Sequence, residues 1–224
     1  MDVSEALHKR VSIRVFKPDP APLATVRAII DDARYAPSGG NLQPWRVIVV
    51  AGEARAAVID AAAKAMAGAP RGSEDAERPV YPENLWEPFR TRRYKVGEDM
   101  YALLGIPRED RPARFAHLAR NYRFFDAPVG LFFVTDRGMG HGQWAHLGMF
   151  MQSIALAAVE RGLATCMQEA WARVRETLAE HFALAPQEMI YCGMALGYAD
   201  ESAPVNTLRS DRASLDEIAE FHGF

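Results

Sequence analysis

Three runs of consecutive apolar residues stand out along the chain, and each has the length of a buried strand. They cover 46–50, 129–135 and 189–196, are rich in β-branched or other large apolar residues, and end at glycine, proline or polar residues. A shorter run over 164–168 predicts a fourth strand. Strands and helices mix along the chain, and the direct interpretation is an α+β sandwich in which helices flank a central sheet.

Helical periodicity fills much of the sequence between these strands. Apolar residues recur three and four positions apart, and the predicted helices cover 2–9, 23–35, 53–67, 114–125, 172–182 and 215–221. The longest pattern, 143–161, is apolar on most of its faces. Such a helix is buried either in a large core or between subunits, and in a chain of 224 residues we favour a subunit interface.

Composition and charge narrow the class of protein. The length predicts a single domain over 1–224, and the net charge of −3 argues against a general nucleic-acid-binding protein. The two cysteines have neither metal-ligand spacing nor the pattern of a disulfide framework, which favours the cytoplasm and no metal. No apolar run approaches the ~20 residues of a membrane span, and no apolar signal core opens the chain.

Two segments do not fit the pattern of strands and helices. Residues 69–110 combine prolines and charges with aromatic residues, and the tail from about 201 is polar with no obvious partner in its own fold. Because aromatic side chains need something to pack on, we expect 69–110 to be an ordered insertion. It is either a lid or pocket wall, or a surface insertion with no role in the chemistry.

The candidate chemistry begins with a cationic cluster near the start of the chain. Residues 10–16 alternate Arg10, Ser12 and Arg14 with apolar residues, which places these three side chains on one face of an extended segment. Arginine and serine on one face suit a phosphate or another bound anion. Taken alone, such a cluster is more often a solvated edge.

A second cluster is the polar loop 36–45, between a predicted helix and a predicted strand. Pro37 ends the helix, and the glycines at 39 and 40 allow close approach of the backbone to a flat ligand. Ser38, Asn41 and Gln43 add hydrogen-bonding groups. Taken in isolation, such a loop is more often an ordinary turn between a helix and a strand.

Together the two clusters resemble the FMN-dependent nitroreductase family, in particular its longer, nitrobenzoate-reductase-like members. The matching residues are Arg10, Ser12, Arg14 and Phe16, followed by the run from Pro37 to Trp45. The resemblance implies a three-layer sandwich with a central mixed sheet, in an intertwined homodimer. It also implies that 69–110 is the insertion of the longer members, and that the arm from about 201 embraces the partner subunit.

The same resemblance implies that each subunit binds one noncovalent FMN. Arg10, Ser12, Arg209 and Arg212 would surround the phosphate, and Arg14 the N1–C2=O edge of the ring. The family's loop over the flavin, supplied by the partner subunit, matches Pro37, Ser38, Gly39, Asn41 and Gln43. The backbone of Gln168 and Glu169 would lie near flavin N5, and no other catalytic group is implied.

The activity implied by the resemblance is a ping-pong transfer of two electrons from NAD(P)H to nitroaromatic or quinone-type acceptors. The candidates for binding the aromatic acceptor are the insertion residues Trp86, Phe89, Arg93 and Tyr94. Two alternatives stay open. One is a specialised family member, such as a flavin-destroying enzyme, a dehalogenase or an enone reductase; the other is a flavin-binding protein without turnover.

Overall fold

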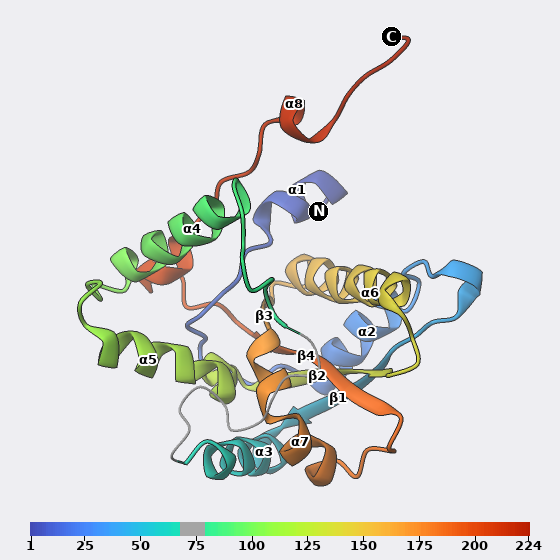
Figure 1. The fold of residues 1–224 in the computed structure, drawn as a ribbon. Helices are drawn as coiled ribbons and strands as arrows, with labels where there is room; N and C mark the ends of the chain where they lie inside the picture. The colour runs from blue at the N-terminus through green and yellow to red at the C-terminus, as the bar shows by residue number, and fades with distance from the viewer. Residues whose placement is uncertain (68–78) are drawn as a thin grey trace.

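A single four-stranded sheet organises the protein (Figure 1), of which the computed structural model describes residues 1–67 and 79–224. The strands lie in the order β1–β2–β4–β3, with β1 Arg46–Ala51, β2 Val129–Asp136, β4 Glu188–Gly197 and β3 Ala164–Gln168. All three neighbouring pairs are antiparallel. One isolated parallel bridge, between Ser12 and Thr165, adds the mixed character at the edge of β3. All four predicted strands are confirmed, but the expectation that 46–50 is buried was wrong: β1 lies at the edge of this sheet, and only Val50 in it is buried.

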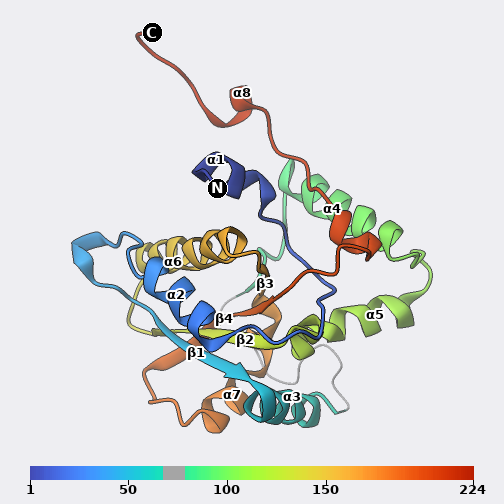
Figure 2. The same cartoon turned by 180° about the vertical axis from the view of Figure 1, so that it is seen from behind.

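Helices cover both faces of the sheet, which confirms the three-layer α+β sandwich (Figures 1 and 2). One face is covered by α2 (Leu23–Ala33) and α6 (His141–Glu160), and the other by α3 (Gly52–Ala65) and α7 (Arg175–His181). Successive residues of β2 point to opposite faces, so Leu131 and Phe133 pack with α6 while Phe132 and Val134 join the other core.

Two strand glycines make room for the largest rings of the second core. A Cβ on Gly193 would lie 2.2 Å from Cδ1 of Trp171, and one on Gly130 would lie 2.4 Å from Cζ of Phe124. Both rings are fully buried, and their centroids are 4.6 Å apart. The sheet therefore accommodates this aromatic pair only because these two positions have no side chain.

The helix predicted over 215–221 covers only Leu215–Ile218. The helices predicted over 114–125 and 172–182 are also shorter than expected, and in both the tertiary packing of aromatic rings is the reason. α5 (Arg111–Ala119) is followed by a 3-10 segment, η2 (Arg120–Asp126), in which Phe124 and Phe125 have positive φ and bury their rings. The helix expected over 172–182 was wrong at its start. A second 3-10 segment, η3 (Glu169–Val174), buries Trp171 before α7 begins.

Most large apolar side chains of helix α6 are buried within their own subunit. Leu147, Phe150 and Ile154 are buried with α2 and the sheet, whereas Met149 is its one large apolar side chain that is exposed. The pattern that favoured a subunit interface is therefore explained by the single chain. No helix in the described ranges is both long and apolar enough to cross a membrane, and no disulfide joins the buried Cys166 and Cys192.

The insertion and the C-terminal arm lie together at one side of the sandwich (Figures 1 and 2). The insertion forms α4 (Phe89–Leu103), and its expected first part, 69–78, lies outside the described residues. After η4 (Pro204–Thr207), the arm runs beside α4 and forms two ion pairs with it. Lys95 of α4 pairs with Asp211 at 3.0 Å, and Arg92 of α4 pairs with Glu217 at 2.8 Å. Its last helix, α8 (Leu215–Ile218), projects away from the sandwich.

Candidate functional site

The cationic segment follows α1 (Val3–Lys9) and runs along the outer edge of β3. The amide of Ile13 donates to the carbonyl of Thr165 at 3.0 Å, next to the parallel bridge. Ile13 turns into the core, while Arg10, Ser12 and Arg14 stay partly exposed. The edge of the sheet thus presents a polar row beside the end of β3.

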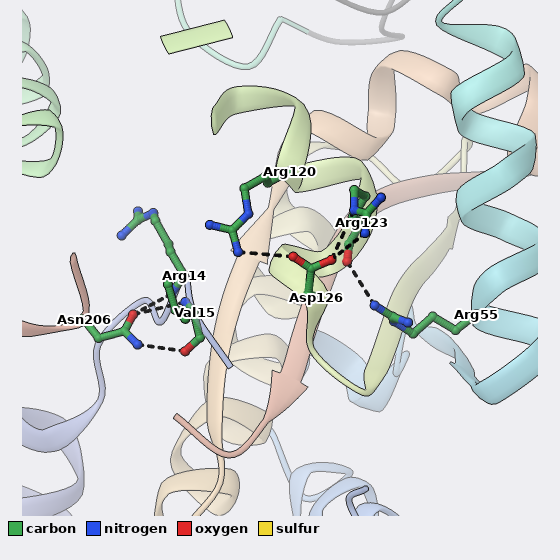
Figure 3. Close-up of polar contacts among 7 residues, drawn as sticks. All are labelled: Arg14, Val15, Arg55, Arg120, Arg123, Asp126 and Asn206. Atoms are coloured by element: carbon green, nitrogen blue, oxygen red, sulfur yellow. Dashed lines mark hydrogen bonds and ion pairs between the residues drawn. The ribbon is translucent and has the colours of Figure 1, made fainter. Parts of the chain in front are cut away.

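Two arginines of this row carry charge that no carboxylate neutralises within the described part of the chain. Nη1 of Arg14 donates to the carbonyl of Ser12 at 3.2 Å, and Arg10 has no ion-pair partner there. By contrast, the nearby Arg120 pairs with Asp126 at 3.2 Å (Figure 3). Burial, reinforced by the charges of Arg120 and Arg14, lowers the pKa of His117 to about 4. The site therefore offers two guanidinium groups to an anionic ligand, beside a neutral histidine.

Asn206, at the start of the C-terminal arm, fixes the backbone of this row (Figure 3). Its Oδ1 accepts hydrogen bonds from the amides of Arg14 at 2.8 Å and Val15 at 3.3 Å. Its Nδ2 donates to the carbonyls of Val15 and Asp200, both at 2.8 Å. No local pattern predicts this role, because the contact joins residues 192 positions apart.

Gln168 and Glu169 lie where β3 ends and η3 begins. The side chain of Gln168 is buried: its Nε2 donates to the carbonyl of Asn121 at 2.8 Å, and its Oε1 accepts from Trp171 Nε1 at 3.4 Å. This side chain is committed to the core, so the backbone is the part of Gln168 that remains for a ligand. That the backbone here lies near a flavin stays a prediction.

The loop Pro37–Gln43 is exposed over most of its length and stabilised from within. Oγ of Ser38 accepts from the amide of Gln43 at 3.0 Å, and Nε2 of Gln43 donates to the carbonyl of Asn41 at 3.3 Å. Gly39, the first residue of η1 (Gly39–Asn41), packs closely on α6, since a Cβ there would lie 3.2 Å from Cε1 of His146.

The structure does not bring this loop and the cationic segment together within one subunit. The loop lies at the N-terminal end of α6, whereas α1 and the segment that follows it lie toward the other end of that helix (Figures 1 and 2). A ligand that contacts both clusters must therefore be shared between two chains, or the two clusters serve different ligands.

The two arm arginines bond to the carbonyls of their own turns. Arg209 donates to the carbonyls of Asn206 at 3.2 Å and Leu208 at 3.1 Å, and Arg212 donates to that of Ser210 at 2.7 Å. Both side chains belong to exposed residues. No hydrogen bond or ion pair among the described residues joins either of them to the cationic segment.

The aromatic candidates of the insertion fall into two groups. Tyr94 is covered on one side by the guanidinium of Arg108 at 5.3 Å, and Arg93 lies over the ring of Tyr81 at 4.1 Å. Trp86 and Phe89 meet edge to face at 5.4 Å and remain 58% and 45% exposed. Tyr81 and Tyr94 are each 51% exposed, so the two groups differ in the arginine over the ring and not in exposure. Within the described residues, no group of three or more His, Cys, Asp or Glu side chains forms a possible metal site.

Comparison with known proteins defines the class. The profile of the Nitroreductase family matches residues 7–198, and the chain belongs to this family. It is similar over its whole length to enzymes of known substrate. Nitrobenzene nitroreductase from Ectopseudomonas oleovorans is 38% identical over 219 residues, which cover 98% of this chain and 96% of that protein. 4-Nitrobenzoate reductase from Pseudomonas putida is 36% identical over 224 residues, covering 100% and 96%.

Solved structures of nitroreductases are similar to this chain as well. The FMN and NADPH-dependent nitroreductase NfnB from Sphigopyxis sp. strain HMH superposes with a TM-score of 0.96 at 44% identity, covering 100% of both chains. The FMN-dependent nitroreductase NfnB from Mycobacterium smegmatis, in complex with NADPH, has a TM-score of 0.91 at 30% identity and covers 99% of this chain and 100% of that one.

Proposed function

We propose that this chain is an FMN-dependent oxidoreductase that transfers two electrons from NADPH to nitroaromatic acceptors. The observation that carries the proposal is the full-length similarity to enzymes described as reductases of nitrobenzene and 4-nitrobenzoate. The structures described as FMN- and NADPH-dependent match the chain over the same length, insertion included. Donor and acceptor would bind in turn, in a ping-pong cycle, and quinones would be accepted as well.

FMN fits the cationic segment because the segment holds positive charge without a carboxylate partner among the described residues. Arg10 and Ser12 would bind the phosphate, and Arg14 would lie at the N1–C2=O edge, where reduction places negative charge. When bound, FMN supplies the two-electron chemistry. The chain itself supplies charge, orientation and the backbone at Gln168–Glu169, and no acid–base pair is required of it.

A homodimer would complete this site. In a twofold dimer, the partner's loop 37–43 can reach the cationic segment that it cannot reach in its own subunit. The end of the arm supports a partner too. Leu215, Ile218 and Phe221 are 60%, 69% and 64% exposed in the single chain, and such apolar side chains on a projecting arm favour burial against a second copy.

The exposed pair Trp86 and Phe89 is our candidate for the acceptor-binding surface. A flat nitroaromatic ring can pack against such a pair by offset or edge-to-face contact. Arg93, which already lies over Tyr81, would add positive charge nearby and favour an acceptor with a carboxylate. Tyr94 is 51% exposed, but Arg108 already lies over one face of its ring, so only the other face would be open to an acceptor.

The decisive experiment begins with the purified protein and its chromophore. Acid precipitation of one sample should release a compound that co-migrates with FMN. In a second, intact sample under anaerobic conditions, NADPH should bleach the bound flavin faster than NADH does. Nitrobenzene or 4-nitrobenzoate should then restore the colour. A colourless protein with no affinity for FMN would refute the proposal, and bleaching without reoxidation by any nitro compound would point to a specialised or non-catalytic flavoprotein. Light scattering of the intact protein should give the mass of a dimer.

A further inference from the structure

We propose that Asn206 is a positioning residue, which holds Arg14 against the ring edge of the cofactor and thereby raises the midpoint potential of the bound flavin. The inference rests on the proposed function, since it concerns the same FMN site. It assigns to the root of the C-terminal arm a role in setting the redox properties of a site built mainly from the N-terminal segment.

The hydrogen bonds of Asn206 leave it little freedom. Its carbonyl oxygen accepts from the amides of Arg14 and Val15, and its amide nitrogen donates to the carbonyls of Val15 and Asp200. Four bonds use the full capacity of an asparagine side chain. The residue is only 7% exposed, so an unbonded partner left by its removal would have little access to water.

Arg14 needs such an anchor because no counter-charge holds it. No carboxylate within the described chain pairs with its guanidinium, whose Nη1 is bonded only to a backbone carbonyl. Hydrogen bonds hold the residue at two places instead, one on its backbone and one on its side chain. Asn206 holds the backbone at the root, and the carbonyl of Ser12 accepts from Nη1 at 3.2 Å near the tip.

The choice of an amide in place of a carboxylate at position 206 fits this role. An aspartate could accept the same two amide hydrogen bonds, but its charge would lie close to Arg14 and offset the positive potential there. It would also face the carbonyls of Val15 and Asp200 without a proton to donate. Asparagine fixes the backbone and leaves the charge of Arg14 available to the ring edge.

A double-mutant cycle on the flavin-loaded protein tests the proposal. The variants are Asn206→Ala, Arg14→Ala and the double variant, and the readout is the midpoint potential from spectroscopic titration. Asn206→Ala alone should reduce the preference for reduced over oxidised FMN about tenfold, which is ~30 mV for a two-electron couple. In the Arg14→Ala background the same substitution should cause no further shift, because Asn206 acts through Arg14.

A matched control lies next to Asn206 in η4. Thr207 bonds only its own turn, with Oγ1 donating to the carbonyl of Pro204 at 2.8 Å, so Thr207→Val perturbs the root of the arm without touching Arg14. Hydrogen exchange of the flavin-free protein adds a second readout. Asn206→Ala should lose protection at the amides of Arg14 and Val15, and Thr207→Val should not.

Each outcome decides one point. Equal shifts in both backgrounds, no shift at all, or a matching shift in Thr207→Val would overturn the positioning role. If Asn206→Ala does not retain flavin, the milder Asn206→Ser carries the same cycle with the same criterion. A wild-type protein that binds no FMN would instead refute the proposed function, and the exchange measurement would still report on the anchor itself.

Discussion

Gly193, in β4 beneath the ring of Trp171, offers a sharp test of how the core supports the candidate site. In Gly193→Ala the new Cβ would lie 2.2 Å from Cδ1 and 2.9 Å from Nε1 of that ring, distances that packed side chains do not tolerate. Trp171 cannot easily move aside. It is fully buried, with the rings of Phe124 and Phe132 at centroid distances of 4.6 and 5.0 Å.

Overpacking a dense core typically costs about 1–3 kcal/mol of unfolding free energy. For a chain of this size, each kcal/mol lowers Tm by roughly 2–4 °C, so we expect Gly193→Ala to lower Tm by about 2–12 °C. The displacement also reaches the site, because Trp171 Nε1 donates to the side chain of Gln168, whose backbone ends β3. FMN affinity should therefore fall together with stability.

Thermal unfolding followed by circular dichroism at saturating FMN measures the effect, with flavin titration alongside. Gly97→Ala is the matched control: Gly97 lies inside α4, and a Cβ there would meet nothing within 4 Å. Replacing this helical glycine should stabilise the helix by up to about 1 kcal/mol, so Tm should stay the same or rise. If Gly193→Ala melts at or above the Tm of the control, the packing argument is wrong. Partial recovery in Gly193→Ala with Trp171→Phe would support it.

Three further predictions concern the charged and aromatic groups. Arg10→Ala should weaken FMN binding by about 1.5–3 kcal/mol in a fluorescence titration, because it would remove the proposed charged hydrogen bond to the phosphate. Arg34→Ala, which removes a surface arginine already paired with an aspartate, should not, and equal affinities would contradict the phosphate assignment. Burial holds the pKa of His117 at about 4, below its ordinary 6.5, so the unfolded chain takes up this proton first as the pH falls. Between pH 6.5 and 4 the unfolding free energy should therefore drop by up to about 3 kcal/mol, a slope that His117→Phe should lack in melts across that range. Phe89→Ala should raise KM for nitroaromatic acceptors by about 2–10-fold in steady-state assays, through loss of a ring contact. Tyr94→Phe, which keeps the ring under Arg108, should leave KM unchanged, and identical values for both variants would remove Phe89 from the acceptor site.

The strands and most helices were predictable because their local patterns agree with their tertiary surroundings. The runs 46–50 and 129–135 are rich in β-branched and other apolar residues, and the structure places both in the sheet, with β2 buried in its interior and β1 at its edge. The helix predicted over 114–125 failed at its end for the opposite reason. The positive φ of Phe124 and Phe125 is imposed by a core that includes Trp171, far along the chain, and no local signal reports it.

The candidate site was predictable where function constrains a short motif and not where it depends on distant contacts. Arg10, Ser12 and Arg14 lie in one short segment, so their pattern is visible in the sequence. Asn206 acts on that segment from the other end of the chain, and the arginine over Tyr94 comes from beyond the helix that carries the tyrosine. Such roles follow from the fold, and composition and periodicity carry no trace of them.

If the proposed dimer forms, the opposite placement of the loop 37–43 and Arg10 has a genetic consequence: variants damaged at the two different places complement one another. In the proposed dimer, each site takes its loop from one chain and its arginine from the other. A subunit without Arg10 still lends an intact loop, and a subunit with a damaged loop still offers Arg10. When two such variants reassociate at random, half of the dimers are mixed, and each holds one intact site and one doubly damaged site. About a quarter of all sites would then regain FMN, whereas sites built within single chains would regain none.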